Sequence, residues 1–222
     1  MAKLDSVSRP PLASDPGPVA QRHSFRIKAY PIAILVTLAV AIVIGTVAAR
    51  NAVELQDGFG GDYPAFYGAG RIGAAGDWDA LYSLDRQIEA QQGLHPSSEG
   101  EVARFFAYPP QVAFLYQPLA GIDYYGSYLL HVLFMVGALC AAIVLARPML
   151  PWLQGRVLLA MTGALLFWPM WRTITGGSNT AFTLLVVVAT WRLVHDGRPV
   201  LGGFVLAGLL FKPQFAIPLL GL

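Results

Sequence analysis

Charged residues and cysteine are both scarce in this chain, and each scarcity removes a class of protein. Only 13% of the 222 residues are charged, about half of what a soluble domain carries. The single cysteine, Cys140, excludes a disulfide framework and a cysteine-based metal site. No group of His, Asp and Glu has the spacing of metal ligands, so we expect no bound metal and no cofactor. The N-terminal basic residues are sparse and lack interleaved aromatic residues, which argues against nucleic-acid binding.

Long apolar runs are abundant instead. Apolar residues make up 55% of the chain, and a run of about 20 of them can cross a bilayer. Five runs are candidates for such spans: residues 30–49, 127–146, 153–171, 180–194 and 200–222. The sequence therefore predicts an all-α fold, a transmembrane helix bundle that crosses the bilayer several times.

The distribution of charge predicts the orientation and the domain limits. Basic residues precede the first run and occupy the linkers around 147–156 and 192–198, which places these segments in the cytoplasm. Residues 1–29 are rich in proline and polar residues and are predicted to be a disordered cytoplasmic leader, followed by a membrane domain over 30–222. The first extracytoplasmic loop, 50–126, holds nine acidic and four basic side chains between residues 50 and 104.

Short helices are predicted in this loop. One follows Asp62 and is expected to lie along the membrane with its apolar side in lipid. A second begins near Ser83 and ends at Gly93. Residues 111–122 are too short to cross comfortably and are predicted to form a juxtamembrane or re-entrant helix, with a short true span as the alternative. A G-x-G-x-x-G pattern at 68–73 follows no strand, so a dinucleotide site is rejected.

Asp62 is the first candidate for chemistry, since Gly61-Asp62-Tyr63 places a carboxylate beside aromatic residues at the edge of the bilayer. It can act as the N-cap of the helix that follows, which contributes about 1 kcal/mol. It can also act as a general base at the mouth of a lipid-facing cleft. Both readings stay open from the sequence, and they are compatible.

Three further elements carry candidate groups. Lys212 lies deep in the last apolar run before Pro213, so it either faces a polar cavity or snorkels to the surface. Arg172 can bind a phosphate with two hydrogen bonds or anchor a head group. The glycine-rich turn over 173–180 is expected on the same side of the membrane as Asp62. Asp77 and Asp79 form a D-x-D pattern that is read as a loop, because nucleotide sugars are absent from that compartment.

Several short motifs occur in a characteristic order: Gly61-Asp62-Tyr63, Leu81-Tyr82, Phe106-Ala107-Tyr108-Pro109-Pro110, Pro118-Leu119, Gly176-x-x-Asn179 and Phe211-Lys212-Pro213. Together they resemble glycosyltransferase family 87, polyprenyl-phosphate-mannose-dependent α-mannosyltransferases of the GT-C architecture. The family's usual Gly-Gln-x-Asn reads Gly176-Gly177-Ser178-Asn179 here. Family members are longer, so we expect this chain to represent the N-terminal part of such an enzyme.

The resemblance implies a multi-pass enzyme of the bacterial plasma membrane. It would move a hexosyl unit, in the first instance mannosyl, from a polyprenyl-phosphate donor to a glycolipid or polysaccharide acceptor on the extracytoplasmic side. Asp62 would be the catalytic base. The substrate-binding residues would be Tyr63, Tyr108, Pro109, Arg172, Asn179 and Lys212. The alternative is a polytopic transporter or lipid-handling module without catalysis, in which Asp62 and Lys212 line a pathway.

Overall fold

The computed structural model describes residues 36–37, 40, 44, 61–94 and 104–219, and the regular elements in these ranges are all helices. The all-α prediction is therefore confirmed for this part of the chain. The predicted leader, 1–29, and all but four residues of the predicted span at 30–49 lie outside the described residues.

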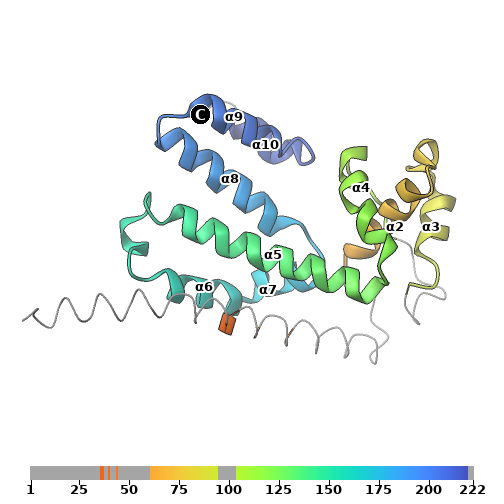
Figure 1. Cartoon of the computed structure of the whole chain (residues 1–222), viewed down its shortest axis with the longest axis horizontal. Helices are drawn as coiled ribbons and strands as arrows, with labels where there is room; N and C mark the ends of the chain where they lie inside the picture. Colours follow the sequence, from red (N-terminus) through yellow and green to blue (C-terminus); the bar gives the residue numbers. More distant parts are fainter. Residues whose placement is uncertain (1–35, 38–39, 41–43, 45–60, 95–103, 220–222) are drawn as a thin grey trace, which may run out of the picture.

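The long helix α5, Tyr124–Ala146, is the axis of the described structure (Figure 1). It begins where the Asp123 carboxylate accepts a hydrogen bond of 2.8 Å from the Gly126 amide, an N-cap that satisfies one of the free amides of the first turn. Helix α8, Thr180–His195, packs along α5, and α9, Pro199–Ala207, packs on α8. Among the described residues, α5 is the one continuous helix long and apolar enough to cross a bilayer.

Two of the predicted spans are broken in the structure. Residues 153–171 form the short η4, Pro151–Leu153, then α6, Val157–Leu166, and α7, Trp168–Thr175, with a bend of 70° between the last two. The last run forms α9 and α10, Pro213–Leu219, on either side of an irregular segment. Prolines in the first turns of α7 and α10 explain both breaks, because proline begins a helix readily but cannot sit inside one without losing a hydrogen bond. A bundle of several continuous spans remains a prediction.

A group of short helices lies at the N-terminal end of α5 (Figure 1). It comprises α2, Tyr63–Ala74; η1, Trp78–Ala80; α3, Leu84–Gln91; α4, Pro110–Tyr116; and η3, Gln117–Gly121. The expected helices after Asp62 and Ser83 are present, and Gly93 follows α3 in the left-handed conformation, as predicted. Residues 111–122 form α4 and η3.

The prediction that the first of these helices turns an apolar side to lipid is wrong. Ten of the twelve residues of α2 are buried, and α3, α4 and η3 pack around it. The G-x-G-x-x-G pattern lies inside α2 and explains this close packing: a Cβ at Gly70 would come within 2.7 Å of the Tyr116 carbonyl, and one at Gly73 within 2.9 Å of the Trp78 ring.

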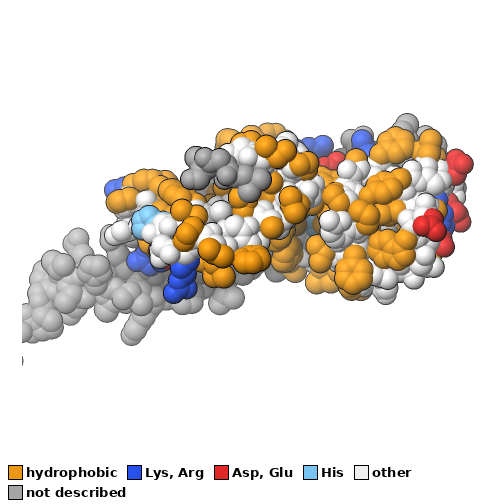
Figure 2. Space-filling model, turned by 90° about the horizontal axis from the view of Figure 1, so that it is seen from above, with side chains coloured by type: hydrophobic (Ala, Val, Ile, Leu, Met, Phe, Trp, Pro, Cys, Tyr) orange, Lys and Arg blue, Asp and Glu red, His pale blue; other side chains and the backbone are white. Residues whose placement is uncertain are grey.

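The surface of the helical body is apolar. Large side chains on α6, α7 and α9 are more than two-thirds exposed, including Leu159, Leu166, Trp168, Val200 and Phe204. On the face in Figure 2, acidic side chains gather at the end that carries the α2–α3 group, while apolar side chains cover most of the length between the two ends. Extended exposed apolar surface of this kind marks contact with a membrane or a partner.

Candidate functional site

Asp62 is held at the turn between α7 and α8, far from it in sequence. Its backbone N–H donates a hydrogen bond of 2.8 Å to the Gly176 carbonyl. The preceding residue, Gly61, has φ +54°, and a Cβ there would lie 2.4 Å from the Gly176 oxygen. Only glycine fits this approach, since another side chain would meet both backbone strain and a steric clash.

The Asp62 carboxylate is not used by the helix that it precedes. Asp62 occupies the N-cap position of α2, yet its side chain makes no capping hydrogen bond, and the residue is exposed. The capping role allowed by the sequence is therefore absent. The carboxylate is free to serve another purpose at this position.

The Asp62 carboxylate acts electrostatically on Tyr108, whose hydroxyl interacts with the side chain of Asn179. Burial and, secondly, the negative charge of Asp62 raise the pKa of the Tyr108 hydroxyl, while the Asn179 side chain interacts with the same hydroxyl and partly opposes this shift. Tyr108 is thus a neutral hydroxyl at physiological pH, able to donate a hydrogen bond. Asn179, just before α8, is 5% exposed, and its Oδ1 has no hydrogen-bond partner among the described residues.

Lys212 approaches the same region from the irregular segment between α9 and α10. Its ammonium lies 5.9 Å from the ring centroids of both Phe211 and Phe215, and the residue is 7% exposed. It interacts electrostatically with Asp62. The break in the helix before Pro213 therefore brings a buried ammonium group within electrostatic reach of Asp62. This ammonium is not presented at the surface, as snorkelling would require.

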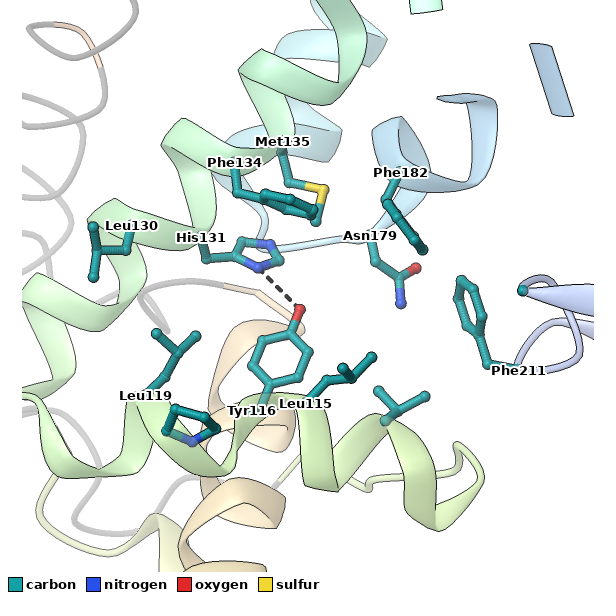
Figure 3. Close-up of a pocket in the computed structure, with 13 residues that line it drawn as sticks. Leu115, Tyr116, Leu119, Leu130, His131, Phe134, Met135, Asn179, Phe182 and Phe211 are labelled. Atoms are coloured by element: carbon teal, nitrogen blue, oxygen red, sulfur yellow. Dashed lines mark hydrogen bonds between the residues drawn. The ribbon is translucent and has the colours of Figure 1, made fainter. Parts of the chain in front are cut away.

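An apolar pocket of about 600 Å³ adjoins this polar group (Figure 3). It lies between α4, α5, α8 and the segment after α9, and Asn179 and Phe211 form its boundary toward Tyr108, whose ring centroid is 6.3 Å from that of Phe211. Its lining is apolar apart from a few groups: Tyr116 and His131, which share a hydrogen bond of 3.0 Å, and Asn179. The exposed Leu115 and Phe134 form part of its wall, so the pocket opens through an apolar rim.

The structure places three of the predicted site residues elsewhere. Tyr63 is fully buried in an aromatic cluster, and its hydroxyl is hydrogen-bonded to Ser127. Pro109 occupies the N-cap position of α4 and is half-buried. Arg172 is exposed on α7, and its charge acts on the hydroxyl of Tyr128. Asp62, Tyr108, Asn179 and Lys212 are the predicted residues that come together.

Asp77 of the D-x-D pattern has a structural role. Asp77 accepts two hydrogen bonds from Arg86, the shorter of 2.6 Å, and Arg86 also pairs with Glu89 at 2.8 Å. These contacts tie η1 to α3. No group of side chains suited to a metal ion occurs among the residues that the structure describes.

The pocket itself was not predicted, because its wall consists of ordinary apolar residues within expected helices. One signal was available. Ser127 and His131 are polar residues four positions apart in an apolar run, and this spacing places them on one face of a helix. That face proves to contact α2, where Ser127 is hydrogen-bonded to Tyr63, and α4, where His131 is hydrogen-bonded to Tyr116.

The fold and the site define an all-helical protein with an extended apolar surface, an apolar pocket and a polar group at the edge of this pocket, which are features typical of a membrane protein. The model of Glycosyltransferase family 87 matches residues 106–222, and the chain belongs to this family. It is therefore a glycosyltransferase, with a sugar donor and an acceptor as its substrates. The matched segment contains Tyr108, Asn179, Lys212 and the pocket but not Asp62. No curated protein and no solved structure matches the chain.

Proposed function

We propose that this glycosyltransferase transfers a hexosyl unit, in the first instance mannosyl, from a polyprenyl-phosphate donor to a glycolipid or polysaccharide acceptor on the extracytoplasmic face of the membrane. The observation that carries the proposal is the placement of Asp62: its carboxylate does not cap α2 and lies with Tyr108 and Lys212 beside an apolar pocket. A donor with a charged head and a hydrocarbon tail needs both kinds of surface side by side.

The polyprenyl tail would occupy the apolar pocket. The pocket has the size of a small-molecule site and an apolar rim, so a chain can enter from the bilayer. Its boundary at Phe211 adjoins Lys212, which supplies a buried positive charge for the phosphate that joins tail and sugar. Such a charge, fixed in a water-poor site, stabilises the negative charge that grows on a departing phosphate.

The transfer needs one base. Asp62 would accept the proton of an acceptor hydroxyl, whose oxygen then attacks the anomeric carbon of the sugar. The bond between that carbon and the phosphate oxygen breaks, and the polyprenyl phosphate leaves with the electron pair, inverting the anomeric configuration. Because phosphate is a good leaving group, no second carboxylic acid is required, unlike in the hydrolysis of glycosides. The neutral Tyr108 hydroxyl would donate a hydrogen bond to an oxygen of the substrate.

Replacing the base tests this function. Membranes carrying the Asp62→Asn protein, supplied with a polyprenyl-phosphate donor labelled in its mannose, should transfer label to the lipid or polysaccharide fraction about 10²- to 10⁴-fold more slowly than wild type. Asp79→Asn, at another exposed aspartate of the same end of the molecule, should transfer normally. Comparison of the expressed amounts and thermal midpoints separates lost chemistry from lost folding.

The outcome also separates the enzyme from a lipid-handling module. Equal transfer by wild type and Asp62→Asn would remove Asp62 as the base. A wild-type protein that moves the intact labelled lipid between leaflets without releasing its sugar would support the non-catalytic alternative instead.

A further inference from the structure

Two buried glutamines of α3, Gln87 and Gln91, make contacts that the proposed chemistry does not use. They lie four residues apart and therefore on one face of the helix. Gln87 is 3% exposed and Gln91 is 8% exposed. A buried amide side chain is costly unless it is hydrogen-bonded, so the partners of these two side chains show what this face of α3 holds.

Both glutamines bind the backbone of the segment that leads to Tyr108. The Gln91 Nε2 donates a hydrogen bond of 2.8 Å to the Arg104 carbonyl, and its Oε1 accepts one of 3.0 Å from the Arg104 amide. The Gln87 Oε1 accepts a hydrogen bond of 3.0 Å from the Phe106 amide. The segment from Arg104 to the start of α4 forms no helix or strand, so these side chains pair backbone groups that a regular element would otherwise pair.

Tyr82, two residues before α3, binds Tyr108 itself. Its hydroxyl donates a hydrogen bond of 2.9 Å to the Tyr108 carbonyl. Gln87 also donates a hydrogen bond of 2.8 Å to the carbonyl of Leu81, so the same side chain fixes the residue before Tyr82 and the segment opposite. The Tyr108 ring, carried by this segment, lies 6.3 Å from the ring of Phe211 at the pocket boundary.

We propose that Tyr82, Gln87 and Gln91 are positioning residues: they form a clamp that holds the backbone from Arg104 to Tyr108 and thereby sets where the Tyr108 hydroxyl meets the substrate. The proposal deepens the proposed function and rests on it for its effect on transfer. The hold on the segment follows from the hydrogen bonds alone. A segment without regular secondary structure depends on such side-chain contacts for its placement, because no ladder of backbone hydrogen bonds fixes it.

Replacing each glutamine by methionine removes the amide with little change in side-chain size. Gln87→Met and Gln91→Met keep a long unbranched side chain that suits a helix. We expect each to lower kcat for transfer by roughly tenfold to a hundredfold, since small misplacements of reacting groups have effects of this size. The donor KM should change little, because the tail and the phosphate would be bound elsewhere. Gln92→Met, at the exposed glutamine that comes next in the chain, should transfer as wild type.

Tyr82→Phe tests the clamp without a buried change. Tyr82 is 55% exposed, and its ring stacks on that of Phe106 with centroids 6.4 Å apart. The variant keeps this ring and loses the hydroxyl that bonds to the Tyr108 carbonyl. Its kcat should fall by about two- to tenfold, the size expected for one hydrogen bond. Unchanged kcat in both Tyr82→Phe and Gln91→Met would contradict the proposal.

A double-mutant cycle tests whether the clamp acts through Tyr108. If it does, Gln91→Met should reduce kcat much less in a protein that already carries Tyr108→Phe, because the hydroxyl that the clamp positions is absent. Equal fold-losses of kcat in the two backgrounds would show that the clamp acts on another group, and they would overturn the proposal.

Hydrogen exchange of backbone amides gives a readout that does not depend on activity. The Arg104 amide should exchange faster in Gln91→Met, and the Phe106 amide in Gln87→Met, than in wild type and Gln92→Met. Unchanged exchange of both amides would show that the glutamines do not hold the segment. If wild type transfers no sugar from the polyprenyl-phosphate donor, the proposed function fails, and the exchange experiment still decides whether the clamp holds the segment.

Discussion

The contact between Gly61 and Gly176 shows how much of the site depends on backbone alone. Gly61 lets the N-terminus of α2 approach the α7–α8 turn until the Asp62 amide and the Gly176 carbonyl meet at 2.8 Å. The main chain of Asp62 is consequently fixed at this turn, while its side chain makes no capping bond.

Adding one methyl group at this contact should be disruptive. Gly61→Ala must adopt φ +54° and place a Cβ at 2.4 Å from the Gly176 oxygen, so the amide–carbonyl bond has to open. We expect a loss of about 1–3 kcal/mol for the backbone conformation alone, more with the clash, and a strong decrease in transfer activity. Thermal denaturation in detergent and the transfer assay measure the two effects.

Gly76→Ala is the matched control for this change. Gly76 also has a positive φ, of +79°, but nothing lies within 4 Å of a Cβ built there. It should cost only the left-handed conformation and leave transfer intact. If both alanine variants lost the same stability and kept full activity, the close approach of Gly61 to the Gly176 carbonyl would not be needed for function.

At the scale of elements, α5 organises the molecule because its start is well defined. Asp123 caps the helix through the Gly126 amide, and four residues later Ser127 meets Tyr63 of α2. The pairing of α2 with α5 therefore depends on where α5 begins. An error of one residue at this end would rotate its polar face by about 100°.

Removing the cap should loosen this end of α5. Asp123→Ala leaves the Gly126 amide without its partner and should cost about 1 kcal/mol, which corresponds to a fall of ~2–4 °C in the thermal midpoint for a chain of this size. Asp123→Asn keeps an oxygen in the same place and should lose much less. Equal midpoints for the alanine variant and wild type would show that the cap contributes nothing.

Elements of strong periodicity or clear boundaries were predictable from the sequence. The apolar run of α5, the helix after Asp62 and the helix between Ser83 and Gly93 are all present. The break before Pro169 was missed, because a hydropathy pattern counts apolar residues and contains no information on a change of direction. The burial of α2 was missed for a related reason: lipid and protein select the same apolar side chains, so composition cannot tell which of them covers a helix.

At the scale of the whole molecule, contacts between aromatic rings hold the short helices α2 and α4 against α5. Among the described residues, the ring of Tyr63 has five neighbours with centroids 4.9–6.3 Å away, contributed by α2, α4 and α5. Rings at such distances attract one another beyond their burial. The cluster joins the acidic end of the molecule to the apolar body.

Alkaline pH should weaken this group. Burial raises the pKa of Tyr63, Tyr67, Tyr108 and Tyr116 above the ordinary value of 10.0. An unfolded chain would ionise these residues near pH 10, and the folded chain only at higher pH, so proton loss favours unfolding. Stability should be constant below about pH 9, begin to fall as the pH rises past the unfolded-state value of about 10, and continue to fall until the pH exceeds the folded-state values. Thermal midpoints in detergent measured across this range test the prediction; a midpoint independent of pH up to about 11 contradicts it.

Part of the site was also predictable from the sequence. A physical reason separates the predicted site residues that come together in the structure from those that do not. Lys212 was singled out because a charge among apolar residues is expensive without a purpose, and Asp62 because a carboxylate beside aromatic residues is expected at the edge of the bilayer. Tyr108 and Asn179 came from the motifs of the family resemblance. Tyr63 belongs to the same set of motifs, yet the helix directs its side chain into the aromatic cluster. Neighbours in sequence point to different sides of a helix, so adjacency to a functional residue is a weak guide.

The meeting of Gly61 with Gly176 has a consequence for how such proteins can be recombined. The segment that carries Asp62, the proposed base, lies outside the stretch matched by the family model, whereas the carbonyl that its amide contacts lies inside it. A loop taken from another protein would bring a carboxylate, but its main chain could reach the Gly176 carbonyl only if the residue before that carboxylate had no side chain. Chimeras should therefore keep glycine at position 61 for an exchanged loop to make the same contact.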